Sequence, residues 1–209
     1  MRLETGLEPL SAELAPLGVV IGARRIRPGD EGAFSDPALE STPDNLARRR
    51  ASGAARIVAT RLLPQLGVAG PVRIARLANG APDWPPGILG SIAHGDLAAV
   101  AALARRGGAL AALGVDIEAD APLPEDVFDF VLTPRERRFC PRGSKLGRLA
   151  FAAKEAVYKA IHPFDGSPLE YQDIECAEDF ASAQIAGGAR LRLRFMTAPA
   201  IIVVAALAA

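Results

Sequence analysis

The stretch Gly114-Val115-Asp116-Ile117-Glu118 carries two carboxylates at a spacing that suits metal binding. Side chains at positions i and i+2 of a strand share one face, about 6.6 Å apart along the chain. Asp116 and Glu118 therefore face the same way, while Val115 and Ile117 face the core. Like charges repel unless a cation lies between them, and Mg²⁺ is held by one or two carboxylates together with substrate phosphates. The pattern indicates a Mg²⁺ site; the alternative is a strand end with two solvated acids.

A second stretch, from Phe151 to Ala160, adds a carboxylate and two lysines. Its residues favour a helix, and its apolar positions recur at helical spacing. Glu155 and Lys159 then lie one turn apart on one face, with Lys154 to one side. Alone, this pair is also typical of a surface ion pair, which contributes little to stability. Together, the two stretches indicate a site for a metal ion and phosphate groups.

These motifs resemble those of the 4′-phosphopantetheinyl transferases, in the two-halved monomeric form that includes the surfactin-type and enterobactin-synthetase-component-D enzymes. The second motif is similar to the family's at seven positions: Phe151, Lys154, Glu155, Ala156, Tyr158, Lys159 and Ala160. Upstream, the enterobactin-type signature is similar to residues 80–94, which include Pro82, Trp84, Ser91 and His94. The resemblance covers residues 46–165, and the ordered set of three motifs is far more specific than any one of them.

The resemblance implies an α+β fold of two similar halves related by a pseudo-twofold axis, with coenzyme A in the crevice between them. We place the boundary near residue 110. Residues 1–110 would form an N-terminal half that binds coenzyme A phosphates, and residues 111–209 a half with the metal site and the Lys/Glu helix. A weak similarity between the apolar segments 96–103 and 200–207, each near the end of its half, fits an internal duplication.

The resemblance also implies roles for individual residues. Mg²⁺, for which Mn²⁺ is expected to substitute, is held by Asp116, Glu118 and Glu155. Lys159 meets the phosphates and stabilises the leaving group, and Glu155 is a candidate for the base that takes the serine proton. Ligation and proton removal compete for that one carboxylate, and a water on the metal could replace either role. Contacts to coenzyme A are assigned to Arg48, Arg49, Arg56, Ser91, His94, Lys154 and Lys159.

Residues 45–66 are expected to form a helix with a basic face, beginning near Ser41-Thr42-Pro43. In the resembled family this helix carries residues that meet the coenzyme A phosphates. Arg56 best matches that pattern, together with either Arg48 or Arg49. Both remain candidates because two registers, one residue apart, fit the pattern. A solvated helix face is the alternative.

His94 is expected at a strand end beside Ser91. The resemblance assigns it to the 3′-phosphate of coenzyme A, because a protonated imidazole beside a phosphate gives a charge-assisted hydrogen bond. A structural hydrogen bond is the alternative for a lone histidine. Trp84 is either a platform for adenine or a cover on the core, and we favour the cover.

Other elements are expected from local patterns. Residues 72–77 are predicted to form a strand, and residues 97–103 and 109–117 an antiparallel hairpin. A capping box from Thr133 to Glu136 predicts a helix start. Pro163 should end the Lys/Glu helix at Ile161. The apolar end, residues 201–209, is too short for a membrane anchor and is predicted to be a core strand.

Composition narrows the class of function. The 209 residues include 24 Lys and Arg against 24 Asp and Glu, so nothing points to nucleic acid or an acidic membrane surface. Two cysteines, Cys140 and Cys176, and two histidines give neither a disulfide framework nor a metal-site spacing. Residues 1–20 lack a signal-peptide pattern, and no apolar run reaches about 18 residues. We therefore expect a reduced, cytoplasmic protein without a membrane span, and the resemblance implies that it is a monomer.

The predicted reaction transfers the 4′-phosphopantetheine arm of coenzyme A to a serine of an apo carrier protein and releases adenosine 3′,5′-bisphosphate. The enterobactin-type motifs favour peptidyl, aryl or acyl carrier domains of peptide and polyketide synthetases, in nonribosomal siderophore or other secondary metabolism. Two alternatives belong to other classes: a module that binds coenzyme A or a carrier without turnover, and a Mg²⁺-dependent hydrolase of nucleotide pyrophosphates. Retention of the three carboxylates with Lys159 argues against the first, and the second would need no protein acceptor.

Overall fold

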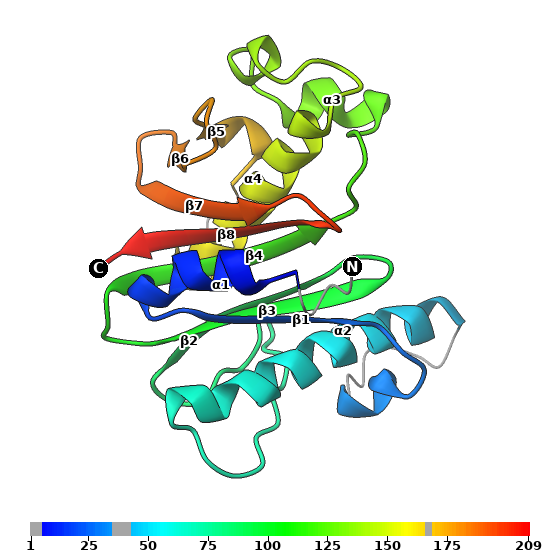
Figure 1. Cartoon of the computed structure of the whole chain (residues 1–209), viewed down its shortest axis with the longest axis vertical. Helices are drawn as coiled ribbons and strands as arrows, with labels where there is room; N and C mark the ends of the chain where they lie inside the picture. The colour runs from blue at the N-terminus through cyan, green and yellow to red at the C-terminus, as the bar shows by residue number, and fades with distance from the viewer. Residues whose placement is uncertain (1–5, 35–42, 166–168) are drawn as a thin grey trace.

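Two antiparallel sheets, each covered by one long helix, build the protein (Figure 1). The computed structural model describes residues 6–34, 43–165 and 169–209. The first sheet has the order β1-β3-β2, and the second has the order β4-β8-β7-β6-β5. In chain order, the strands are Val20–Arg25 (β1), Ile88–His94 (β2), Ala98–Arg105 (β3), Leu110–Glu118 (β4), Ile174–Cys176 (β5), Ser182–Ile185 (β6), Arg190–Met196 (β7) and Ile201–Ala208 (β8). The α-helices are Glu8–Leu14 (α1), Pro43–Leu62 (α2), Glu125–Val131 (α3) and Lys145–Asp165 (α4).

The layers follow from the apolar faces of the strands. On the outer face of the first sheet, α2 packs Val58 and Leu62 against Leu103. The inner faces of the two sheets meet in a second core, where α1 adds Leu10 and Leu14. The outer face of the second sheet is covered by α4. The resulting order is α2, first sheet, second sheet, α4 (Figure 1).

The two halves repeat one topology. In the first half, β1, α2, β2 and β3 follow one another and give the sheet order β1-β3-β2. In the second, β4, α4, β7 and β8 give the equivalent order β4-β8-β7, again antiparallel throughout. The weakly similar segments 96–103 and 200–207 fall on β3 and β8, the central strands of the two units. The α+β class with two similar halves is therefore confirmed, while the boundary near residue 110 stays a prediction.

The predicted hairpin of residues 97–103 and 109–117 is wrong. β4 pairs with β8, with Asp116 opposite Val203, and β3 pairs with β1 and β2 in the other sheet. The turn between β3 and β4 passes the chain from one sheet to the next. Because both strands are apolar on both faces, each takes a place inside a layered core instead of pairing with its neighbour in sequence.

Smaller differences concern elements in the first half. The predicted strand over residues 72–77 is reduced to a single bridge between Arg76 and Pro82. The basic helix begins at Pro43 and ends as α2 at Leu62, followed by a 3₁₀ turn over Leu63–Leu66. Ser41 and Thr42, where its start was expected, lie outside the described residues.

The second half departs from two local predictions and confirms a third. Thr133 and Glu136 exchange the capping-box hydrogen bonds, at 2.8 and 3.2 Å, but only a 3₁₀ turn follows. α4 continues past Pro163 to Asp165, because a proline in the last turn removes few helical hydrogen bonds. The apolar C-terminal segment is the core strand β8, as predicted. No helix in the described part of the chain is long and apolar enough to cross a membrane.

Gly114 is the point where β4 touches α4. A Cβ atom there would lie 1.9 Å from the carbonyl oxygen of Ala156 and 2.7 Å from the amide nitrogen of Ala160. Gly114→Ala is therefore expected to push α4 away and to lower the free energy of unfolding by about 1–3 kcal/mol, measured by urea denaturation. Gly95→Ala is the control, because its added Cβ would lie 3.6 Å from the nearest atom. Equal stability of the two variants would contradict a tight contact at Gly114.

Candidate active site

The end of β4 and the middle of α4 meet at an ion pair. Gly114 and Asp116 lie on the same face of β4, the face covered by α4, while Val115 and Ile117 are buried between the sheets. The Nζ atom of Lys159 lies 2.5 Å from Oδ1 of Asp116, whose side chain is only 7% exposed. The two sequence motifs thus converge at one place.

The other two predicted acids have different partners. Arg148 donates to Oε2 of Glu118 at 2.9 Å, and the hydroxyl of Tyr171 donates to Oε1 of Glu155 at 2.6 Å. Each of the three carboxylates therefore accepts a hydrogen bond from a different donor.

Burial raises the pKa of Asp116 and of Glu118. For Asp116, loss of water opposes and outweighs the nearby positive charge of Lys159, and the charge of Glu155 raises the pKa further. For Glu118, the charge of Asp116 adds to burial, against the opposing effect of Arg148. The pKa of Tyr171 is raised well above its ordinary value by burial and then by its bond to Glu155. The acids are close enough to disfavour one another's ionised form, as expected where a cation is to bind.

Asp116 has one oxygen that suits a metal. Its Oδ2 is buried and has no hydrogen-bond partner in the part of the chain that the structure describes, an uncommon state for a buried polar atom. Within those same described ranges, no three His, Cys, Asp or Glu side chains lie close enough together to hold a metal. Mg²⁺ usually takes one or two carboxylates and completes its shell with waters and phosphates, so these residues fit an ion bound together with phosphates. The full ligand set of Asp116, Glu118 and Glu155 stays a prediction.

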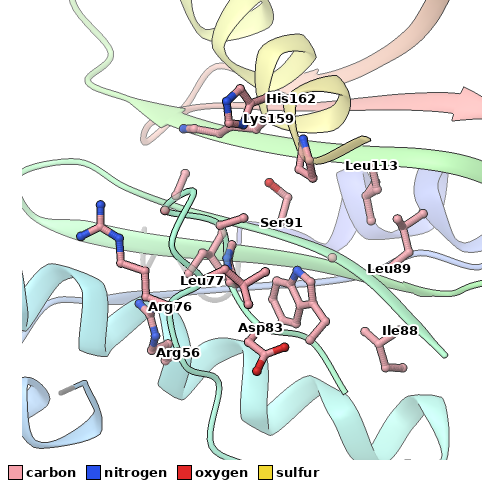
Figure 2. A pocket seen from close by; sticks show the side chains of 18 of the residues that line it. Arg56, Arg76, Leu77, Asp83, Ile88, Leu89, Ser91, Leu113, Lys159 and His162 are labelled. Atoms are coloured by element: carbon pink, nitrogen blue, oxygen red, sulfur yellow. The ribbon is translucent and has the colours of Figure 1, made fainter. Parts of the chain in front are cut away.

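A cavity of about 830 Å³ lies between the two halves beside the ion pair. Figure 2 shows Lys159 and His162 of α4 on one side, Ser91 and Leu89 of β2 in the middle, and Arg56 of α2 on the other side. The walls thus combine an apolar strand with cations from both halves. This combination suits a ligand with an apolar or neutral arm and several phosphates.

The tryptophan of the predicted signature lines this cavity and also covers the core. A Cβ atom at Gly90 would lie 2.8 Å from the indole ring of Trp84, so the ring packs directly on β2. Trp84 is partly buried against the core under α2. The interpretation of Trp84 as a cover on the core is supported, with part of the side chain still facing the cavity.

The arginines of α2 differ in their access to the cavity. Arg48 is exposed and lines the cavity, whereas Arg49 is absent from its wall. Arg56 also lines it, although its Nε donates to the carbonyl of Ile74 at 2.8 Å and its guanidinium lies 4.0 Å from the ring centre of Phe34. These contacts hold Arg56 in place, and the geometry favours Arg48 over Arg49 as its companion.

Ser91 and His94 lie on β2 at the wall of the cavity. The Oγ atom of Ser91 accepts a hydrogen bond from the amide of Val115 at 3.0 Å. Since β2 and β4 belong to different sheets, this bond joins the two halves next to the Asp116 motif.

Two family models match consecutive parts of this chain. The 4′-phosphopantetheinyl transferase N-terminal domain matches residues 40–104, and the 4′-phosphopantetheinyl transferase superfamily matches residues 112–199. The chain belongs to the 4′-phosphopantetheinyl transferase superfamily. The resemblance predicted from the three motifs is thereby confirmed.

Three relatives of this superfamily match the chain over partial alignments. The 4′-phosphopantetheinyl transferase Svp of Streptomyces mobaraensis is 39% identical over 59% of this chain and 52% of its own length. Npt of Nocardia iowensis is 40% identical over 60% of this chain and 57% of its own length. PptT of Mycobacterium tuberculosis is 37% identical over 53% of this chain and 50% of its own length. The chain spans about half the length of the relatives that it matches.

Lys154 was predicted to contact coenzyme A, but in this protein its contacts are structural. Its side chain is fully buried, with Nζ 2.6 Å from Oε2 of Glu136. Nζ also donates to the carbonyls of Val131 at 2.8 Å and Tyr171 at 2.9 Å. An ammonium group has three hydrogens, and these partners use all of them. The structure therefore argues against the predicted contact of Lys154 with coenzyme A.

Arg148 and Tyr171 are partners of the predicted acids that the sequence reasoning did not identify. Arg148 precedes Glu155 by seven residues on α4, a spacing that places both on one helix face, so this signal was present in the sequence. Tyr171 lies beyond the end of α4, and no local pattern relates it to Glu155. Only the fold brings it there.

The pKa of His94 is lowered, first by partial removal of water from the ring and then by the positive charges of Lys159, Arg48 and Arg56. A bound 3′-phosphate would reverse this repulsion. We therefore expect the imidazole to be neutral at neutral pH without ligand and its pKa to rise when coenzyme A binds. NMR titration of the ring nitrogens measures this, with His94→Ala to assign the signals. Dephospho-coenzyme A should give a smaller rise, and equal shifts with both ligands would remove His94 from the 3′-phosphate.

Proposed function

We propose that the protein transfers the 4′-phosphopantetheine arm of coenzyme A to a serine hydroxyl of an apo carrier protein and releases adenosine 3′,5′-bisphosphate. The Lys159–Asp116 ion pair beside the large cavity carries the proposal. In it, a cation of the kind that suits phosphates lies next to a carboxylate that suits a metal, at the wall of a cavity of the size that ligand sites have. The three matched relatives are named as 4′-phosphopantetheinyl transferases, which supports the same reaction.

The chemistry needs a proton acceptor and neutralisation of charge. The serine oxygen forms a bond to the phosphorus that carries the pantetheine arm, while the bond from that phosphorus to the oxygen of the leaving adenosine bisphosphate breaks. The serine proton passes to Glu155 where that residue acts as the base, and Lys159 faces the charge that develops on the leaving oxygen. Mg²⁺ would neutralise the negative charge of the pyrophosphate when Asp116 and Glu118 hold it. Glu155 would be a third ligand where it is not the base.

Binding of coenzyme A is assigned to cations of the N-terminal half. Arg48 and Arg56 on α2 and His94 on β2 all line the cavity, and we assign them to the 3′-phosphate together with Ser91. The net charge is +0, so recognition of a polyanion depends on this local group of cations. Peptidyl, aryl or acyl carrier domains of siderophore or other secondary metabolism are the proposed acceptors, and the proposed setting is a cytoplasmic monomer.

Intact-mass analysis of candidate apo carriers tests the function. With coenzyme A and Mg²⁺, a true acceptor should gain the mass of one phosphopantetheine group, and a carrier whose acceptor serine is replaced by alanine should gain none. Release of adenosine 3′,5′-bisphosphate without any carrier would favour a pyrophosphate hydrolase. Binding of coenzyme A with neither outcome, across a panel of carriers, would favour a binding module without turnover.

A further inference from the structure

Tyr171 is held at both its backbone and its side chain. Its hydroxyl donates to Oε1 of Glu155 at 2.6 Å, and its backbone carbonyl accepts from Nζ of Lys154 at 2.9 Å. Its ring packs edge-on against Phe130 and at a tilt against Phe151, with ring centres 5.5 and 5.6 Å away. These contacts leave the phenol little freedom to move away from Glu155.

Lys154, Glu155 and Tyr171 form one hydrogen-bonded group. Lys154 and Glu155 are consecutive residues of α4. Lys154 donates a hydrogen bond to the backbone carbonyl of Tyr171, and Glu155 accepts one from the Tyr171 hydroxyl. Lys154 is fixed in turn by its buried ion pair with Glu136. Oε1 of Glu155 is thereby occupied, whereas no hydrogen bond joins Oε2 to another described residue. Glu155 and Tyr171 also line a smaller cavity of about 260 Å³.

We propose that Tyr171 is a positioning residue for Glu155. This inference rests on the proposed function and adds a residue to it. The phenol holds the carboxylate in one orientation, so that Oε2 is directed to the metal ion or to the serine proton. Hydrogen-bond partners of metal ligands and of catalytic groups commonly change affinity or activity by about 10- to 100-fold when removed, because the ligand then samples several orientations.

Tyr171→Phe tests the proposal, because it removes the hydroxyl and keeps the ring between Phe130 and Phe151. Turnover should fall about 10- to 100-fold, with the KM for coenzyme A changed by less than about twofold and the melting temperature near that of the wild type. Mn²⁺ binding, measured by electron paramagnetic resonance without carrier, is expected to weaken by about tenfold if Glu155 is a ligand.

A double-mutant cycle with Glu155→Gln separates positioning from packing. If Tyr171 acts through Glu155, adding Tyr171→Phe to Glu155→Gln should change neither turnover nor the Mn²⁺ affinity by more than about twofold. Coupling seen in turnover alone also supports the proposal, because Glu155 then acts as the base. Effects that multiply, or a Tyr171→Phe protein with wild-type turnover and Mn²⁺ affinity, would overturn it.

Gln172→Leu is the matched control. Gln172 donates to the carbonyls of Phe130 and Leu132, so its replacement loosens the same segment without touching Glu155. It should leave the Mn²⁺ affinity unchanged. If the wild-type protein modified no carrier, the proposed function would fail. The double-mutant cycle measured by Mn²⁺ affinity would still decide whether Tyr171 acts on Glu155. If that cycle then showed no coupling between the two residues, the inference would be overturned as well.

Discussion

Asp116→Asn is expected to lower phosphopantetheine transfer by on the order of a thousandfold, since stabilisation of phosphate charge by a metal contributes several kcal/mol and each 1.4 kcal/mol or so is a factor of ten. The amide keeps the shape of the carboxyl but cannot hold Mg²⁺ as an anion does. Steady-state transfer to a carrier, assayed at saturating Mg²⁺, measures the loss.

Unfolding would not explain this loss. Burial raises the pKa of Asp116, so its ionised form is unfavourable in the folded chain. The stability that this carboxyl contributes is complete below its unfolded pKa and is lost as the pH rises through its higher folded pKa. At neutral pH, a neutral amide should therefore leave the melting temperature unchanged or higher. Asp120→Asn is the matched control, because Asp120 forms a more exposed ion pair with Lys145 at 2.8 Å. Wild-type turnover in Asp116→Asn would refute the metal assignment.

Lys154→Met is expected to lower the free energy of unfolding by about 3–5 kcal/mol, because it leaves the carboxylate of Glu136 buried without its counter-charge. Both side chains of this pair are 0% exposed. Glu136 also accepts from the backbone amides of Thr133 and Cys176, so its position cannot relax easily. Urea denaturation followed by circular dichroism measures the change.

Lys145→Met provides the comparison within the same helix. Lys145 is 56% exposed in its ion pair with Asp120, and exposed pairs contribute less than about 1 kcal/mol. Adding Glu136→Gln to Lys154→Met should recover part of the lost stability, because it removes the unpaired charge. If the Lys154→Met protein had normal stability but bound coenzyme A more weakly, this result would support the predicted contact of Lys154 with coenzyme A, against which the structure argues.

Local periodicity explains what the sequence determined by itself. Alternation in β4 placed Val115 and Ile117 in the core and Asp116 on the opposite face, and helical spacing placed Glu155 and Lys159 together on α4. Both patterns depend only on residues within a few positions of one another. The order of the three motifs likewise identified the superfamily, and the apolar end of the chain was correctly predicted as a strand. The identity of the ligands at the acids remains a prediction.

Only the tertiary structure decided which surfaces these elements meet. Both faces of β4 are buried, and the strand pairs with β8. The sequence had predicted a pairing with the preceding strand, because the two strands are neighbours along the chain. Lys154 and Lys159 are alike in type and five positions apart, yet Lys154 meets the buried Glu136 and Lys159 meets Asp116 at the cavity. Tyr171 reaches Glu155 from beyond the end of α4. Such contacts join residues distant in sequence, so their partners are fixed by the packing of the whole core and by no pattern within one segment.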